Sequence, residues 1–425
     1  MKFAWRTAVA LAALAVAGVQ AQPMAQSVAP LGADLPSLLT WAREHNPELA
    51  AMRHEATAAQ ERVLPAGALM DPKFKVELQD ITKMGEQGPT LLPSDAGATA
   101  YTLTQELPWS GKRELRRDLA TLEAQGAHGR TRQSGAELAA RIKALFVQRY
   151  LVQANQTLVA ETLELMLQLE KVLQVRYAGG LAAQQDITRI HVEHTGMRAD
   201  LVDLANQSRQ AQTRLNALLG RAADAPLAAV QALRPVPDAA SLEFGALSQR
   251  MLAANAQLGT EASRVQAAQK ARDLTYKNRY PDFMLGLSAT QRQGDVKEWG
   301  LMLEINLPIR DGVLRAQERE GEAMLLAAQA RQQAAANQAL ADLADNLSAL
   351  EAARQSEHLV RFSLMPQTEL TWQAALAAYE NGKADFAMLL DAQRQIRQAR
   401  LSLLKAQAEA QMRLADIEKL VGEEL

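Results

Sequence analysis

Two histidines are the residues whose types and spacing most readily suggest chemistry. His191 and His194 stand three apart in a segment with helical character, so both imidazoles could face one side and hold a metal ion. Glu193 lies between them and would point elsewhere. Paired histidines on a helix are more often ordinary surface residues, and the other four histidines are scattered. A metal site at this pair is therefore a secondary hypothesis.

Catalytic motifs are absent from the sequence. It contains no Gly-x-Ser-x-Gly, no His-Glu-x-x-His, no phosphate loop and no dinucleotide fingerprint. With no cysteine, disulfides, iron–sulfur clusters and thiolate zinc sites are excluded. The net charge of −2 lacks the basic excess typical of nucleic-acid binders. We expect a protein that is not an enzyme and that binds neither a cofactor nor nucleic acid.

The first residues have the pattern of a secretory signal. Lys2 and Arg6 precede an apolar stretch at 8–17, and Val19-Gln20-Ala21 fits a cleavage site, so residues 1–21 form the expected signal peptide. Beyond residue 21 no run of about 18 apolar residues predicts a membrane-spanning helix. The mature chain is expected to be periplasmic, secreted, or inserted in the outer membrane as strands.

The sequence contains an internal duplication. We predict a first repeat at 22–220, a linker at 221–240 that contains three prolines, and a second repeat at 241–425. Six short matches occur in the same order in both repeats. The matched segments are 46–49 with 255–258, 58–60 with 267–269, 71–74 with 280–283, 101–108 with 301–308, 177–180 with 379–382, and 218–220 with 420–422.

Long helices dominate each repeat. In the first repeat we predict a helix over about Pro36 to Val63, a strand from Pro72, a strand ending at Pro108, a long helix from Lys112 to Arg176, and a return helix from Ala183 to Leu219. The long helix would measure roughly 98 Å, about the combined length of the other two. It carries a heptad pattern typical of a coiled coil. The heptad residues are Leu138, Leu145, Val152, Val159, Met166 and Leu173.

Four strands are predicted to have one apolar and one polar face, because their residues alternate in character. A small sheet capping a helical body would show this pattern, and so would a membrane barrel with water inside. Four strands cannot close a barrel, so several chains would have to share one. The expected lipid-facing residues are Phe74, Val76, Leu78, Tyr101, Leu103, Phe283, Leu285, Leu287, Leu301, Leu303 and Ile305. The loops Ile81 to Thr99 and Gln291 to Glu298 are expected to be exposed.

The duplicated order of helix, two strands, long helix, turn and helix resembles the TolC-type outer-membrane efflux proteins. The stretch Gln105 to Arg116 (QELPWSGKRELR) is similar to the branch that serves heavy-metal (cobalt-zinc-cadmium type) efflux. Tyr-x-x-Gly at the two helix turns and Leu-x-x-Leu-Leu-Gly at Leu215 to Gly220 are also typical of the family. Ser110 departs from this branch, which more often has an aromatic residue or proline there, and the lipid-bearing cysteine of some relatives is missing.

The resemblance implies a mainly α protein with β strands that assembles as a homotrimer. Three chains would form a twelve-stranded β-barrel in outer-membrane lipid of a Gram-negative bacterium and a periplasmic α-barrel of long coiled-coil helices. The protein would be the passive exit duct of a tripartite resistance–nodulation–division system, with a periplasmic adaptor and an inner-membrane pump as partners. Drug efflux, type I secretion, and a soluble periplasmic coiled-coil scaffold remain alternatives.

The helix turns are the implied gate and adaptor-docking sites. A tyrosine followed by Gly-Gly or Asn-Gly between helices makes a tight turn in which glycine accepts positive φ. Three copies of Asp385 would form a ring that attracts cations. At the start of the long helix, Lys112, Arg113, Arg116 and Arg117 are expected to lie near anionic groups at the inner membrane surface. The implied tip residues are Tyr177, Gly180, Leu181, Ala182, Ala183, Asp186, Tyr379, Gly382, Lys383, Ala384, Asp385 and Met388.

Overall fold

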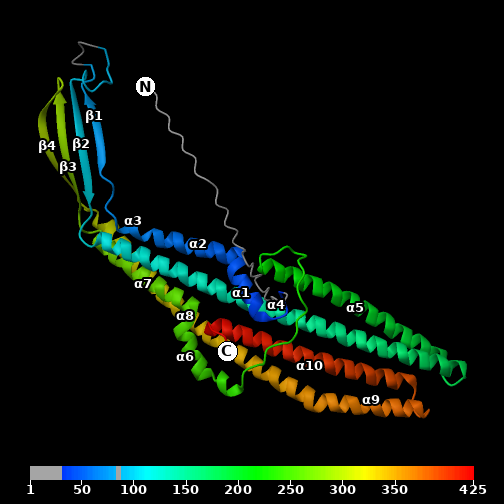
Figure 1. Cartoon of the computed structure of the whole chain (residues 1–425). Helices are drawn as coiled ribbons and strands as arrows, with labels where there is room; N and C mark the ends of the chain where they lie inside the picture. The colour runs from blue at the N-terminus through cyan, green and yellow to red at the C-terminus, as the bar shows by residue number, and fades with distance from the viewer. Residues whose placement is uncertain (1–30, 83–87) are drawn as a thin grey trace, which may run out of the picture.

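The computed structural model describes residues 31–82 and 88–425, so the expected signal peptide at 1–21 lies outside the described residues. The molecule is elongated, with a four-stranded sheet at one end and two helix turns at the other (Figure 1). The C-terminus lies near the middle of its length. Within the described chain, no helix is both long enough and apolar enough to cross a bilayer.

The first predicted helix is three helices, and the expectation of one helix from Pro36 to Val63 was wrong. The chain forms α1 (Leu35–His45), α2 (Pro47–Glu61) and α3 (Val63–Gly67). The breaks fall at Asn46 and Arg62. The backbone of Asn46 is extended, because the proline that follows disfavours the helical conformation. The Asn46 side chain then caps α2 by accepting a hydrogen bond from the Leu49 N–H at 2.8 Å.

The long helix and the return helix of the first repeat form as predicted. Helix α4 (Lys112–Ala178) runs without a break for 67 residues, and α5 (Gln184–Leu218) returns beside it. Five of the six heptad residues of α4 are buried, and Leu145 is partly buried against one core cluster. The predicted coiled-coil seam is therefore confirmed.

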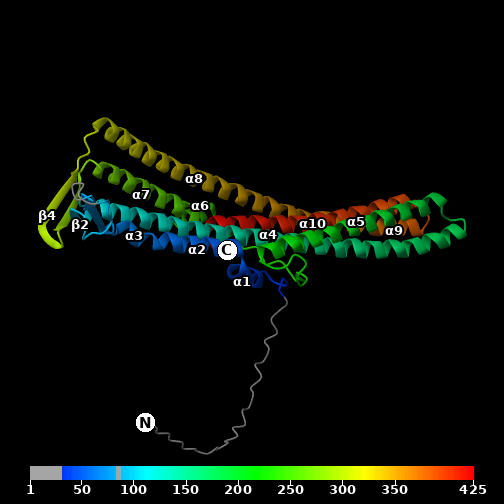
Figure 2. The same ribbon diagram turned by 90° about the horizontal axis from the view of Figure 1, so that it is seen from above.

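The second repeat follows the same order but divides its long helix. It consists of the short 3₁₀ helix η2 (Ala239–Leu242), α6 (Phe244–Ala254), α7 (Ala256–Lys277), α8 (Asp311–Leu359), a π-helical segment η3 (Val360–Leu364), α9 (Met365–Glu380) and α10 (Phe386–Val421). Helix α4 packs on α5 and on α10, and α9 packs on α10. Helix α7 also packs along α4. Seen from above, α8 diverges from α4 toward the sheet (Figure 2).

The four strands form one antiparallel sheet in the order β1-β2-β3-β4. Their bounds are β1 (Lys73–Gln79), β2 (Ala98–Leu107), β3 (Asp282–Arg292) and β4 (Asp295–Asn306). The expected loop from Gln291 to Glu298 was wrong, because β3 and β4 are joined by only Gln293 and Gly294. Both residues have positive φ, 55° and 90°, as a tight hairpin turn requires.

The same contact occurs in both repeats at the end of the return helix, where an asparagine side chain donates to a helix carbonyl. Asn46 donates to the Leu218 carbonyl at 2.8 Å, and its counterpart Asn255 donates to the Leu420 carbonyl at 2.7 Å. Each asparagine also caps the helix that follows it. The sequence matches at 46–49 with 255–258 and at 218–220 with 420–422 thus describe one repeated contact.

Candidate functional site

The apolar strand residues share one exposed face of the sheet. The register pairs Phe74 with Leu103, Leu103 with Leu287, and Leu287 with Leu301, so one apolar row crosses all four strands. All eleven predicted lipid-facing residues lie on this face, which we call the apolar sheet face. Eight are exposed, up to 83% for Leu301, and Leu78, Tyr101 and Phe283 are half-buried. An exposed apolar surface of this extent indicates contact with lipid or with another protein.

The opposite face of the sheet carries charges that pair along and across the strands. Lys73 contacts Glu106 at 2.7 Å, and Lys75 contacts Glu77. The two β1 lysines alternate with Phe74 and Val76, as the sequence predicts. This face is compatible with contact with water, because exposed ion pairs of this kind remain solvated.

The four basic residues at the start of α4 differ in their surroundings: two make contacts within the protein and two are exposed. Lys112 is 3% exposed and donates to the Tyr280 carbonyl and to Asp282 Oδ1, both at 2.9 Å. Arg113 donates twice to the Gly67 carbonyl. The expectation that Lys112 lies at the inner membrane surface was therefore wrong, because its buried ammonium joins α4 to the start of β3. Arg113 is half-buried and joins α4 to α3. Arg116 and Arg117 are exposed.

The tip of α9 is held against α4 through Tyr379. Arg176 of α4 donates to the Tyr379 carbonyl at 3.0 Å, and its guanidinium lies 4.5 Å from the centre of the tyrosine ring. Phe386 meets that ring edge-on at 5.6 Å. Burial raises the pKa of the Tyr379 hydroxyl. The matching Tyr177 is 45% exposed, so the two tips differ.

The other predicted tip residues lie at the two helix turns. Gly180 and Gly382 have φ of 71° and 68°, which confirms the positive φ expected there. Asp385 is exposed, but one of its oxygens accepts from the Met388 N–H at 3.0 Å and caps α10. Leu181, Ala183, Lys383 and Met388 are exposed, and Ala182, Asp186 and Ala384 are half-buried.

The histidine pair meets a carboxylate that the sequence did not indicate. His191 Nε2 lies 2.9 Å from Glu170 Oε1, and His194 Nδ1 lies 3.2 Å from Glu170 Oε2. Glu170 is on α4, so the three residues brace α5 against it. Over residues 31–82 and 88–425, no group of three potential ligands is arranged to hold a metal ion. Glu193 turns away to Arg394, as its position predicts.

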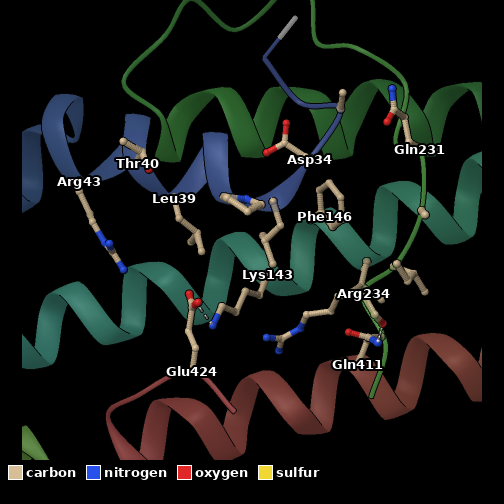
Figure 3. A pocket seen from close by; sticks show the side chains of 16 residues that line it. Asp34, Leu39, Thr40, Arg43, Lys143, Phe146, Gln231, Arg234, Gln411 and Glu424 are labelled. Carbon is tan, nitrogen blue, oxygen red and sulfur yellow. Dashed lines mark hydrogen bonds and ion pairs between the residues drawn. The ribbon is translucent and has the colours of Figure 1, made fainter. Parts of the chain in front are cut away.

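A cavity of about 450 Å³ lies between α1, α4, the linker and α10 (Figure 3). At its side Lys143 points toward Glu424, and Arg234 of the linker lies beside Gln411. Lys143 also contacts the buried Glu418 at 2.8 Å, and Arg234 makes two bonds of 2.6 Å to the same carboxylate. No sequence signal marked this cluster, because its members are far apart in the chain.

Burial alone would raise the pKa of Glu418. Hydrogen bonds from Arg234, the Leu425 N–H and Lys143 outweigh that effect and lower the pKa below its ordinary value. The cluster therefore holds a charged carboxylate inside the protein and ties the linker to both repeats.

Comparisons with known proteins agree with this architecture. The profile described as outer membrane efflux protein matches residues 38–221 and 247–423. The chain is 23% identical over 400 residues to the cobalt-zinc-cadmium resistance protein CzcC of Cupriavidus metallidurans, covering 91% of this chain and 90% of that protein.

Solved structures with the same fold include three with high similarity. A membrane protein from Pseudomonas aeruginosa has a TM-score of 0.79 at 20% identity, covering 93% of this chain and 91% of its own. The outer membrane protein VceC of Vibrio cholerae has a TM-score of 0.77 at 19% identity, covering 92% and 96%. CusC has a TM-score of 0.77 at 16% identity, covering 92% of both chains. The chain belongs to the outer membrane efflux protein family, whose members are transport channels rather than enzymes.

Proposed function

We propose that three copies of this chain pool their strands into one twelve-stranded barrel in the outer membrane and form a passive exit duct. The observation that carries the proposal is the apolar sheet face together with two open edge strands, β1 and β4. Four strands are too few to close, and open edges are not tolerated in lipid. Identical chains resolve both problems by pairing edge to edge. The expected signal peptide and the family support placement in the outer membrane of a Gram-negative bacterium.

The helix turns are the proposed contact with a periplasmic adaptor and, through it, an inner-membrane pump. Exposed apolar side chains gather near the α4–α5 turn, where Val175 and Leu181 are each 74% exposed. Such a patch at the end of a long helical hairpin suits docking of a partner. The contact between Arg176 and Tyr379 holds the α9–α10 hairpin against the α4–α5 hairpin. We assign the gate to this contact.

Heavy-metal cations are the proposed cargo. Two observations support this: the similarity to the resistance protein whose name specifies cobalt, zinc and cadmium, and the similarity of Gln105 to Arg116 to the metal-efflux branch. Substrate choice would reside largely in the pump, because a water-filled duct discriminates weakly. Removing the gene should lower tolerance to cobalt, zinc or cadmium while leaving dye tolerance unchanged; the reverse result would favour drug efflux.

Reconstitution in planar bilayers tests the duct directly. The purified mature chain should form discrete conductance steps and migrate as an oligomer that heat dissociates on gels. A soluble periplasmic scaffold would give neither, and extraction without detergent as a silent monomer would refute the proposal.

A further inference from the structure

Two methionines interrupt the charged face of the sheet, which lies opposite the apolar sheet face. Met284 on β3 and Met302 on β4 are the only large apolar side chains on this face of strands β1 to β4, whose other residues there are charged, amide, hydroxyl or small. Met284 is half-buried and Met302 is 38% exposed. In the proposed barrel this face lines a water-filled lumen, so burial of apolar surface does not explain the two side chains.

The register of the β3–β4 hairpin brings the two thioethers together. Met302 lies opposite Gly286, and Met284 stands two residues before Gly286 on the same face of β3. A Cβ added at Gly286 would lie 2.8 Å from Met302 Cε and 3.3 Å from Met302 Cβ, so the Met302 side chain lies across the glycine. Its sulfur, which is bonded to Cε, is therefore held over β3 beside Met284. A larger residue than glycine would occupy this space.

A carboxylate lies next to the two thioethers. Glu304 is directly opposite Met284, at the separation at which cross-strand side chains interact. Glu304 is exposed and makes no ion pair within residues 31–82 and 88–425. Glu106 is the neighbour of Met284 on the other side, and it pairs with Lys73 at 2.7 Å. This row of the sheet thus leaves the charge of one carboxylate, that of Glu304, without a cationic partner.

Two thioether sulfurs and one carboxylate oxygen form a ligand set for a soft metal ion. Thioethers select soft ions such as Cu(I), whereas Mg²⁺ and similar hard ions prefer oxygen ligands. Methionine has three rotatable side-chain bonds, so both sulfurs can turn toward one ion. The thioethers carry no charge, and the carboxylate supplies the negative charge that attracts the cation.

We propose that Met284, Met302 and Glu304 bind a soft monovalent cation of the copper(I) and silver(I) class at the inner wall of the duct. The proposal rests on the proposed function, because it takes the charged face as the wall of the lumen, and it names a class of cation that this wall retains. Three copies of the chain in one barrel place three such sites around the pore. Divalent zinc and cobalt are held less tightly, because imidazole and carboxylate suit them better than a thioether does.

Silver nitrate is the probe for this site, applied to the reconstituted channel in a nitrate electrolyte because silver chloride is insoluble. Silver should lower the single-channel conductance of the wild type reversibly. Met284→Leu with Met302→Leu keeps a similar apolar volume and should raise the half-blocking silver concentration at least about tenfold. Met324→Leu is the matched control, since Met324 is 56% exposed on α8, and it should keep the wild-type response. Zinc nitrate should affect all three proteins equally.

The outcomes separate the site from the duct. A conducting channel that silver blocks equally in the wild type and in the double variant would overturn the site and leave the duct standing. A loss of the silver response in Met324→Leu as large as in the double variant would also overturn the site. If the protein does not conduct, the proposed duct fails, and titration of the detergent-solubilised protein with silver nitrate tests the site alone. Equal silver affinity of the wild type and the double variant in that titration would overturn the site as well.

Discussion

Glu418 shows how one side chain joins distant parts of this chain. Glu418 is 4% exposed, and its carboxylate accepts hydrogen bonds from Arg234 of the linker, Lys143 of α4 and the Leu425 N–H. A buried charge is tolerated only when its partners replace water, and removing one partner of such a group is costly. Each charged group of the cluster therefore depends on its partners, and together they stabilise the middle of the molecule.

Glu418→Gln should destabilise the protein by roughly 3–5 kcal/mol at neutral pH, because it removes the carboxylate that pairs with Arg234 and leaves Lys143 only the more distant Glu424 at 3.8 Å. The folded pKa of Glu418 lies below its ordinary value, so the unfolded chain binds more protons as pH falls. The stabilisation is present above about pH 4.3 and is lost as pH falls through the folded pKa. Denaturant unfolding across pH should show a shallower acid dependence in the variant.

Glu409→Gln is the matched control on the same helix. Glu409 pairs with Arg413 one turn away, and both side chains are more than a third exposed. Its loss should cost less than about 1 kcal/mol. Equal costs for the two variants would contradict the role assigned to the Glu418 cluster.

Two equivalent glycines differ in what surrounds them. Gly220 and Gly422 have φ of 67° and 85°, so alanine would be strained at either position. An added Cβ would lie 2.6 Å from the His45 carbonyl oxygen at Gly220, but 3.3 Å from the Ala254 carbonyl oxygen at Gly422. Gly220→Ala should therefore lower the melting temperature more than Gly422→Ala. The same loss in both variants would mean that backbone strain alone sets the cost.

At the scale of elements, the two repeats use one plan but pack differently at their tips. The first hairpin combines an unbroken α4 with α5, and the second combines α9 with α10 after the π-helical segment. Few contacts hold α9 to α4 beyond the Arg176–Tyr379 pair and the shared core around Phe386. The second hairpin is the element better suited to move.

Arg176→Gln should loosen the tip, because it removes both the cation–π contact and the bond to the Tyr379 carbonyl. The loss of about 1–2 kcal/mol would favour the released state by roughly 5- to 30-fold. Single-channel recordings should show longer openings or larger conductance. Lys171→Gln, an exposed charge removed from the same helix, should behave as wild type. A tip unaffected by Arg176→Gln would place the gate elsewhere.

At the scale of the whole molecule, the sheet determines where the protein can reside. One face is apolar and exposed, the other is charged, and β1 and β4 leave their edges unpaired. Adjacent residues of one strand therefore face different surroundings in the proposed barrel. Leu301 lies on the apolar sheet face, and Met302 lies on the charged face in register with Gly286.

Leu301→Arg should block membrane insertion, because arginine at a lipid-facing position costs roughly 2–4 kcal/mol near the bilayer centre. Met302→Arg adds the same charge one residue away and should insert normally while shifting permeability toward anions. Outer-membrane fractionation and reversal potentials measure the two effects. Equal insertion of both variants would refute the assignment of the faces.

The sequence by itself determined the periodic features of this protein. The heptad of α4, the alternation in four strands and the matched repeats depend on spacing along the chain, and local geometry converts spacing into faces. Phe74, Leu103, Leu287 and Leu301 could be assigned to one surface before any pairing was known. The break at Asn46 was also readable, since Pro47 follows it, but the regular apolar pattern on either side obscured it.

Only the tertiary structure decided which distant side chains meet. Glu170 contacts both histidines, Lys112 is buried against Asp282, and Glu418 gathers Arg234 and Lys143 from segments far apart in the chain. The sequence spacing of charged residues on helices does not distinguish those exposed to water from those in buried ion pairs. Their fate depends on how the helices pack, because burial and partner distance set the energy of a charge and neither is encoded at a fixed spacing.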